Sequence, residues 1–416
     1  INRVSVRMLD RHGICWQCSV ERGIMTGNQS GRHFLQIPGP TNVPGRVLQA
    51  IEQPTIDHRG PRFQQLVRDV LDRLPLIFKT DSPIIIFPSS GTGAWEAALV
   101  NTLSAGDKVL MYETGHFASL WCVLAERLGL DPQLIAGDWR SGVDADAIQC
   151  ILEEDNEHNI KAVCVVHNET STGVTSDIRA VRNAIDSAGH SALLMVDTIS
   201  SLASIDYRHD EWGVDVTVAG SQKGLMLPPG LGFNAVSEKA LSATEKATLP
   251  RSYWSWAEVL ETNQSGFFPY TPATNLLMGL QEAIEMLLGE GLENVFSRHL
   301  RFGEATRRAV QAWELELLCL NSLEFSNSLT AVVMPETINA DDFRRIVLER
   351  FDMSLGNGLG QLAGKVFRIG HLGDFNDLML MATLSGIEMT LDVSAVPHKK
   401  GGVQAAIDYI ATQAQA

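Results

Sequence analysis

The chain has 416 residues, 45% of them hydrophobic and 20% charged, which is typical of a globular protein with more than one domain. Its formal net charge of −16 argues against a nucleic-acid or anionic-membrane partner. No apolar run approaches the roughly 18 residues that a membrane-spanning helix needs. The 6 cysteines are too sparse for a disulfide framework, so we expect a cytoplasmic protein.

Residues 1–24 lack helical or strand periodicity, and we expect them to be a leader outside the fold, with Met25 as the natural start. They contain Cys15-Trp16-Gln17-Cys18, but no second cysteine pair lies near, so we predict no metal site. The segment also lacks the continuous apolar core of a signal peptide.

The first strongly patterned region leads into a loop rich in serine and glycine. Three prolines make residues 37–44 extended or turn-like, and residues 62–78 read as an amphipathic helix. A buried strand is expected at residues 84–87, followed by PSSGTG (residues 88–93) and a helix at residues 94–103. A helix N-terminus with glycines and hydroxyls predicts an anion site, although a plain helix cap is the commoner meaning of such a loop. No Walker lysine follows, which disfavours a P-loop.

Strand and helix patterns then alternate, which predicts an α/β fold with a mostly parallel sheet covered by helices on both faces. Three of the expected strands end in polar residues. HNETSTG (residues 167–173) follows Val166, Asp197 follows Val196, and Lys223 lies just beyond Ala219. Because ligands of such sheets gather at the carboxyl ends of strands, we expect these residues to share one crevice.

Lys223 follows a Gly-Ser-Gln turn and precedes Gly224 and a Pro-Pro-Gly turn at residues 228–230. Glycines and prolines on both sides suit a lysine that is held in place and desolvated. A strand-end lysine with a strand-end aspartate is what a pyridoxal phosphate site needs, because the lysine forms a Schiff base and Asp197 pairs with the ring nitrogen. Each residue alone is more often a surface lysine or a helix cap.

A second unit is expected after a long helix at residues 275–289, with the boundary near residue 290. The division is therefore a leader (1–24), an N-terminal arm with a large domain (25–290), and a small domain (291–416). The expected elements of the small domain are a helix at 291–312, strands at 315–319 and 329–334, a helix at 341–351 and a closing helix pair at 375–413.

Seven motifs occur in order across residues 37–373: IPGPTNVP, PTIDHRGP, SSGTGAWEAAL, HNETSTGV, VDTISS, GSQKGLMLPPG and KVFRIGHLG. Together they resemble the class V, fold type I pyridoxal-phosphate aminotransferases, and most closely the serine–glyoxylate and alanine–glyoxylate branch. The resemblance implies a large domain with a mostly parallel seven-stranded sheet between helices, and a smaller α+β C-terminal domain. It also implies a homodimer with active sites at the subunit interface.

The resemblance assigns roles to individual residues. Lys223 and Asp197 become the catalytic pair, with Asp197 keeping the ring nitrogen protonated. Arg368 matches the arginine whose fork takes the substrate carboxylate, and Gly39 is also placed at the substrate. The remaining cofactor-binding positions are Ser90, Gly91, Thr92 and Gln222 at the phosphate, Thr271 at the phosphate of the neighbouring subunit, Thr170 near the phenolic oxygen, and Phe117 on the ring face, where alanine–glyoxylate relatives carry tryptophan.

Several of these positions keep a structural alternative. Phe117 is also read as a core phenylalanine, and Arg368 as part of a surface salt bridge. His167 is as well explained as a structural histidine and is left out of the catalytic set. His58 and Arg59 stay open between the substrate entrance and a subunit interface.

The function implied by the resemblance is transfer of an amino group from a small L-amino acid to glyoxylate, giving glycine by a ping-pong mechanism. The branch favours L-serine, giving hydroxypyruvate, while L-alanine and L-aspartate remain open as donors. A lyase of the cysteine desulfurase kind would need a reactive cysteine on a mobile loop, whereas Cys319 lies in the apolar run LELLCL. A non-catalytic scaffold would not need Lys223 and Asp197.

Overall fold

The computed structural model describes residues 6–9, 15–18 and 31–413. The chain divides into two units, residues 1–33 and residues 34–416. In the first unit, β1 (Val6–Leu9) pairs antiparallel with β2 (Cys15–Cys18), regular structure that the sequence pattern does not predict. The rest of the predicted leader lies outside the described residues.

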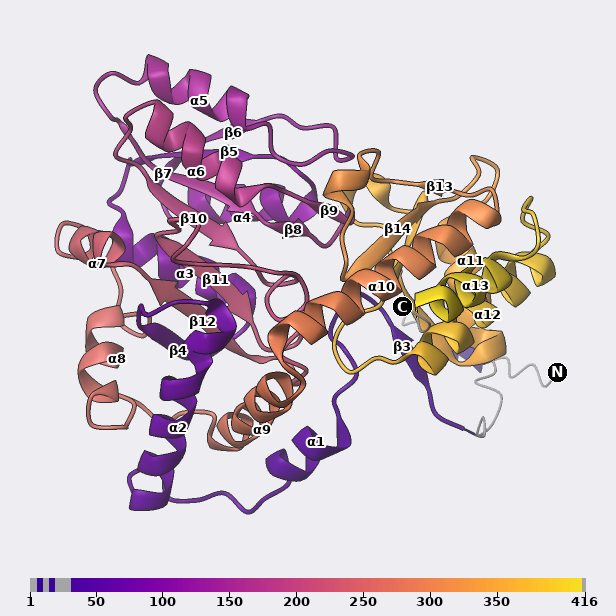
Figure 1. Cartoon of the computed structure of the whole chain (residues 1–416), viewed down its shortest axis with the longest axis horizontal. Coiled ribbons are helices and arrows are strands. Elements are labelled where there is room, and N and C mark those ends of the chain that lie inside the picture. The colour runs from indigo at the N-terminus through magenta and orange to yellow at the C-terminus, as the bar shows by residue number, and fades with distance from the viewer. Residues whose placement is uncertain (1–5, 10–14, 19–30, 414–416) are drawn as a thin grey trace. The chain divides into compact units, whose positions relative to one another are not determined.

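The second unit contains a seven-stranded sheet with the order β4-β12-β11-β10-β7-β5-β6 (Figure 1). β12 alone runs antiparallel to its two neighbours, and the other pairs are parallel. The predicted α/β class with a mostly parallel seven-stranded sheet is therefore confirmed. The strands are β4 (Ile84–Ser89), β5 (Lys108–Tyr112), β6 (Asp131–Ile135), β7 (Ile160–Val166), β10 (Leu193–Asp197), β11 (Val216–Gly220) and β12 (Gly230–Val236).

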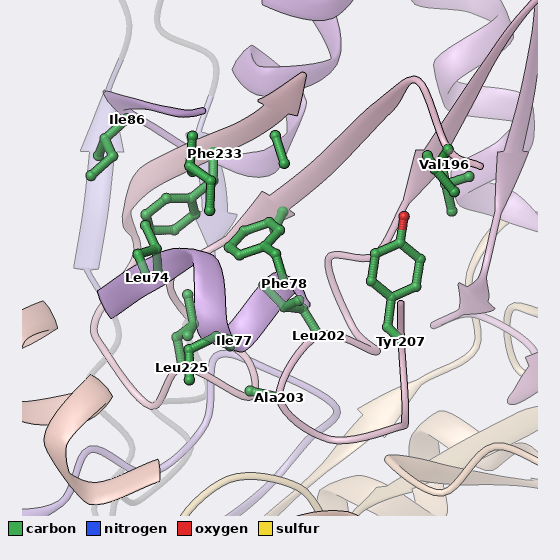
Figure 2. Close-up of a cluster of buried hydrophobic side chains, with 14 of the residues drawn as sticks. Leu74, Ile77, Phe78, Ile86, Val196, Leu202, Ala203, Tyr207, Leu225 and Phe233 are labelled. Carbon is green, nitrogen blue, oxygen red and sulfur yellow. The ribbon is translucent and has the colours of Figure 1, made fainter. Parts of the chain in front are cut away.

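Helices cover both faces of this sheet because successive side chains of a strand point to opposite faces. In β4, Ile84 and Ile86 pack in the core that contains α2, whereas Ile85 and Phe87 pack in the core that contains α3. Figure 2 shows Phe78 of α2 in one cluster with Ile86 and Phe233. The helices are α1 (Gly45–Ile51), α2 (Pro61–Phe78), α3 (Gly91–Thr102), α4 (His116–Arg127), α5 (Ala145–Glu154), α6 (Ile178–Ser187), α7 (Glu238–Thr244), α8 (Trp256–Asn263) and α9 (Thr274–Glu290).

A five-stranded sheet with the order β13-β14-β16-β15-β3 follows in the C-terminal part. Its strands are β3 (Phe34–Gln36), β13 (Glu316–Leu317), β14 (Leu329–Val333), β15 (Met353–Asn357) and β16 (Val366–Gly370). Four helices and two short 3-10 turns accompany it: α10 (Leu292–Ala312), α11 (Ala340–Phe351), α12 (Asp377–Val393), α13 (Gly402–Gln413), η1 (Ser322–Glu324) and η2 (Gly360–Leu362). The division of residues 25–416 near residue 290 stays a prediction, and Gly291 joins α9 to α10 at that point.

Strand β3 and a short two-stranded ladder lie near the site described below. β3 comes from the N-terminal arm and pairs parallel with β15, with Phe34 opposite Met353. The arm therefore belongs to the small sheet before it runs on to α1. A two-stranded ladder, β8 (Asn168–Glu169) with β9 (Val174–Thr175), follows the carboxyl end of β7.

None of the helices in the described part of the chain combines the length and apolar character that a bilayer span requires.

Candidate active site

A cavity of about 220 Å³ opens where β7, β10 and β11 end and α3 begins. The predicted site residues all line it except Thr271 and Arg368. Its lining comprises Gly39, Pro40, Ser90, Gly91, Thr92, Trp95, Phe117, Val166, Asn168, Thr170, Asp197, Ile199, Gln222, Lys223 and Pro229. The carboxyl edge of the sheet thus gathers residues from sequence positions far apart, as expected for an open α/β sheet.

Lys223 lies in the turn after β11 and is only 7% exposed. Its Nζ donates a hydrogen bond to the carbonyl of Pro38, and the Thr41 hydroxyl donates to its backbone carbonyl at 3.1 Å. Burial lowers the pKa of the Lys223 ammonium to about 7, and the positive charge of Arg368 adds to this effect, while Asp197 opposes it. Lys223 can therefore exchange a proton near neutral pH.

Gly39 lies against this lysine. A Cβ added at Gly39 would come within 2.6 Å of Lys223 Cε and Nζ, and its backbone φ of +106° also favours glycine. The N-terminal arm can therefore approach Lys223 this closely only with a glycine at position 39.

Asp197 is the last residue of β10 and is buried. Its carboxylate accepts hydrogen bonds from Trp95 Nε1 at 2.9 Å and from the backbone N–H of Ile199 at 2.6 Å. Burial is the main cause that raises the pKa of Asp197 to about 7, with the Glu169 carboxylate adding to it. A positive charge facing this carboxyl group, such as a protonated ring nitrogen, would favour its ionised form.

The beginning of α3 provides the anion-binding features expected of residues 90–92. Ser90 is the N-cap residue, and its side chain makes no capping hydrogen bond. Free N–H groups of a first helical turn attract anions. A Cβ at Gly91 would lie 2.6 Å from Ile199 Cγ1, so glycine allows this close approach. Gln222 Oε1 is buried at the cavity and has no hydrogen-bond partner, which leaves a polar group available to a ligand.

Arg368 lies in β16, at the edge of this site. Its Nε donates to the carbonyl of Asn357 at 2.7 Å, and its Nη1 donates to the carbonyl of Thr170 at 2.8 Å. These partners are backbone carbonyls, so the guanidinium is oriented without the salt bridge that was the alternative reading. Burial lowers the pKa of Arg368 to about 10, which still leaves it charged at neutral pH. Thr170, which lines the cavity, connects Arg368 to it.

The remaining predicted positions lie outside the cavity. Thr271 is exposed in the segment before α9, so its expected role toward a neighbouring subunit stays a prediction. His167 is buried against Tyr207 and Trp212, its Nδ1 lies 2.9 Å from Ser201 Oγ, and burial lowers its pKa to about 4, all of which favour the structural reading. His58 is partly buried and Arg59 is exposed, in the loop before α2.

Sequence reasoning missed Trp95, and it placed Asn168 and Glu169 in the crevice only as part of HNETSTG, without a role for either. Trp95 stacks on Trp121 and supports Asp197. Asn168 lines the cavity, and Glu169 is buried beside it. A signal was present, because two polar residues followed a buried strand within HNETSTG, but it did not reveal which side chains faced inward.

Cys319 has the properties of a core residue. It is 6% exposed, and burial raises the pKa of its thiol to about 11, so it is a poor nucleophile at neutral pH. This matches the interpretation of LELLCL as core and gives no support to a lyase that uses this cysteine.

Comparison with known families first identifies the class of enzyme. The chain belongs to the class V aminotransferase family, whose model matches residues 33–359. It is 48% identical to a serine–glyoxylate aminotransferase of Methylorubrum extorquens, over 91% of this chain and 96% of that protein. It is 46% identical to an L-aspartate–glyoxylate aminotransferase of Paracoccus denitrificans, over 90% and 95%. Among solved structures, a pyridoxamine–pyruvate aminotransferase of Mesorhizobium loti matches 93% of the chain and 99% of its own, with a TM-score of 0.86 and 26% identity.

Proposed function

We propose that this aminotransferase uses pyridoxal phosphate to move the amino group of L-serine to glyoxylate, giving hydroxypyruvate and glycine. The observation that carries this proposal is the meeting of Lys223 and Asp197 in one cavity beside the N-terminus of α3. The 48% identity to a serine–glyoxylate aminotransferase supports the choice of substrates.

The residues of the cavity fit the proposed cofactor. The N-terminus of α3 with Ser90 and Thr92 suits a phosphate, and Gln222 offers a polar group that lacks a partner. Asp197 suits a protonated ring nitrogen. When bound, pyridoxal phosphate supplies an aldehyde that reacts with amines and a ring that accepts electrons from the substrate Cα–H bond.

The protein's own groups then divide the work. Lys223, with its pKa near 7, would take the proton from the substrate Cα and deliver it to the carbon of the cofactor's former aldehyde group. Asp197 would keep the ring nitrogen protonated, and Arg368 would orient the substrate by its carboxylate. Because donor and acceptor use the same site in turn, the kinetics should be ping-pong.

The charges around the cavity favour a donor with one carboxylate. Among the described residues that line it, Lys223 is the only cation, and Arg368 beside it already donates two of its N–H groups to backbone carbonyls. A second carboxylate would have no evident partner in this chain, which favours serine or alanine over aspartate. L-Aspartate is kept as the second candidate donor because of the 46% identical relative.

A panel of L-serine, L-alanine and L-aspartate with glyoxylate, read by glycine formation, tests the proposal. We expect kcat/KM to be highest for L-serine and at least roughly tenfold lower for L-aspartate, since an unpaired buried charge costs more than 1.4 kcal/mol. A preference for L-aspartate would overturn the choice of donor. Absence of glycine with every donor would overturn the acceptor as well.

The proposal includes a cytoplasmic homodimer in which Thr271 contacts the phosphate in the neighbouring subunit's site. Its exposed position outside the cavity of its own chain supports this arrangement. Mixing Thr271→Ala with Lys223→Ala protein tests it, because a mixed dimer would contain one site with both an intact lysine and an intact threonine. Activity above that of either variant is expected, whereas no gain would place Thr271 elsewhere.

A further inference from the structure

Glu169 is a buried carboxylate to which the proposed chemistry assigns no task. It is 0% exposed and lies in β8, just beyond the carboxyl end of β7. Its four hydrogen-bond donors are neutral: the N–H groups of Phe117, Ala118 and Ser171, at 3.3, 3.1 and 3.0 Å, and the Ser171 hydroxyl at 2.6 Å. A buried charge is costly unless such donors satisfy it, and four donors converge on this carboxylate.

Two of these donors belong to the first turn of α4. This helix begins at His116, and its N-cap, Gly115, has no side chain to provide a cap. Glu169 reaches across from another element and supplies both the acceptor oxygens and the negative charge that a helix N-terminus favours. A Cβ at Gly115 would lie 2.5 Å from Glu169 Cγ and from Ser171 Oγ, so glycine makes room for this approach.

The same turn of α4 carries Phe117, whose side chain lines the cavity. The next residue after Glu169 is Thr170, whose carbonyl accepts from Arg368. We infer that Glu169 is a positioning residue, whose carboxylate holds the first turn of α4 and so keeps the Phe117 ring against the ring of the bound cofactor. The inference rests on the proposed function for the identity of that cofactor.

The contribution of Phe117 depends on this support, because an aromatic ring stacks well only within a narrow range of distances and angles. Glu169→Gln keeps the size of the side chain but replaces one acceptor oxygen by a donor. The amide NH2 would then face a backbone N–H, leaving a buried donor unpaired. The first turn of α4 should loosen, while the seven-stranded sheet stays folded.

The test compares wild type, Glu169→Gln and Asp177→Asn in two measurements. Asp177 is an exposed residue that caps α6 through the N–H of Ala180 at 3.0 Å and does not line the cavity, so its variant controls for neutralising a helix cap away from the site. We expect the Kd for pyridoxal phosphate to rise roughly tenfold in Glu169→Gln and to stay unchanged in Asp177→Asn.

The second measurement is hydrogen–deuterium exchange of the protein without added cofactor. The amides of Phe117 and Ala118 should exchange faster in Glu169→Gln and at the wild-type rate in Asp177→Asn. An unchanged Kd together with unchanged exchange would overturn the inference. Faster exchange with an unchanged Kd would overturn the link between α4 and the cofactor.

If Glu169→Gln does not fold, Ser171→Ala decides the question at Phe117 and Ala118, whose N–H groups bond to Glu169 and not to Ser171. It removes the hydroxyl that donates to Glu169 and accepts from the His116 N–H at 2.9 Å, and it leaves the carboxylate in place. A roughly threefold rise in Kd with faster exchange at Phe117 supports the inference, and wild-type values overturn it. Failure of the wild-type protein to bind pyridoxal phosphate would overturn the proposed function, whereas the exchange data would still decide whether Glu169 holds α4.

Discussion

Two buried basic residues, one lining the cavity and one next to it, come from two different sheets and differ in how far burial changes their charge. Lys223 follows β11 of the seven-stranded sheet, with its Nζ bonded to the carbonyl of Pro38. Arg368 lies within β16 of the five-stranded sheet and donates to two backbone carbonyls. Burial lowers both pKa values, to about 7 for Lys223 and about 10 for Arg368.

The difference shows how burial acts on two chemical types. An ammonium that loses hydration approaches neutrality, so Lys223 can give up its proton at physiological pH. A guanidinium starts from a much higher pKa and stays charged at neutral pH when it is buried. The first residue is thereby suited to proton transfer and the second to permanent binding of a carboxylate.

The largest expected effect comes from removing the group that is able to lose its proton. Lys223→Ala should lower kcat for serine with glyoxylate by on the order of 10³-fold or more, because acid–base catalysis and the covalent attachment point are lost together. Steady-state assays of glycine formation measure this. Lys239→Ala is the control, since Lys239 bonds to the carbonyl of Ala192 and lies away from the cavity. Turnover near the wild-type level in Lys223→Ala would disprove the assignment.

The next effect comes from replacing the permanent cation by one of different shape. Arg368→Lys keeps the charge but loses the fork and the bonds to two carbonyls, so KM for L-serine should rise roughly 10- to 100-fold, with a smaller change in kcat. Arg344→Lys is a matched control, because Arg344 also donates its Nε to a backbone carbonyl, that of Leu355. Equal KM changes in both variants would mean that Arg368 has only a structural role.

The smallest effect concerns stability and sharpens the contrast in pKa. Between pH 7 and 10.5 the unfolded chain binds a proton at Lys223 that the folded chain does not. The free energy of unfolding therefore rises with pH in this window, and the destabilisation caused by burying Lys223 decreases. Lys223→Met should raise the free energy of unfolding of the cofactor-free protein by on the order of 1 kcal/mol near pH 7. The unpaired carbonyl of Pro38 offsets part of the gain.

This stabilisation should disappear toward the upper end of the same window, and denaturant unfolding at several pH values measures it. Lys246→Met, on an exposed residue, controls for the loss of one positive charge. A stabilisation that stays constant with pH would show that Lys223 does not titrate as the burial implies.

Much of the fold was predictable because its signals are local. β7, β10 and β11 are short apolar runs ended by polar residues, and the structure places them in the sheet as expected. β6 was not predicted, because its sequence DPQLI begins with a charge and a proline, and it lies at the sheet edge where such residues are tolerated. The three-residue β3 escaped notice because its partner, β15, lies more than 300 residues further along.

The sequence by itself determined the order of the motifs and the strand-end positions of Lys223 and Asp197, because residue type and spacing express these directly. The class of enzyme followed from the resemblance of those motifs to a known family. Only the tertiary structure decided which atoms meet. The bond from Trp95 to Asp197 joins residues 102 positions apart, and the first turn of helix α4 is held by the Glu169 carboxylate from strand β8. Hydrogen bonding is directional and short-ranged, so its partners are selected by packing in space, which sequence spacing does not encode.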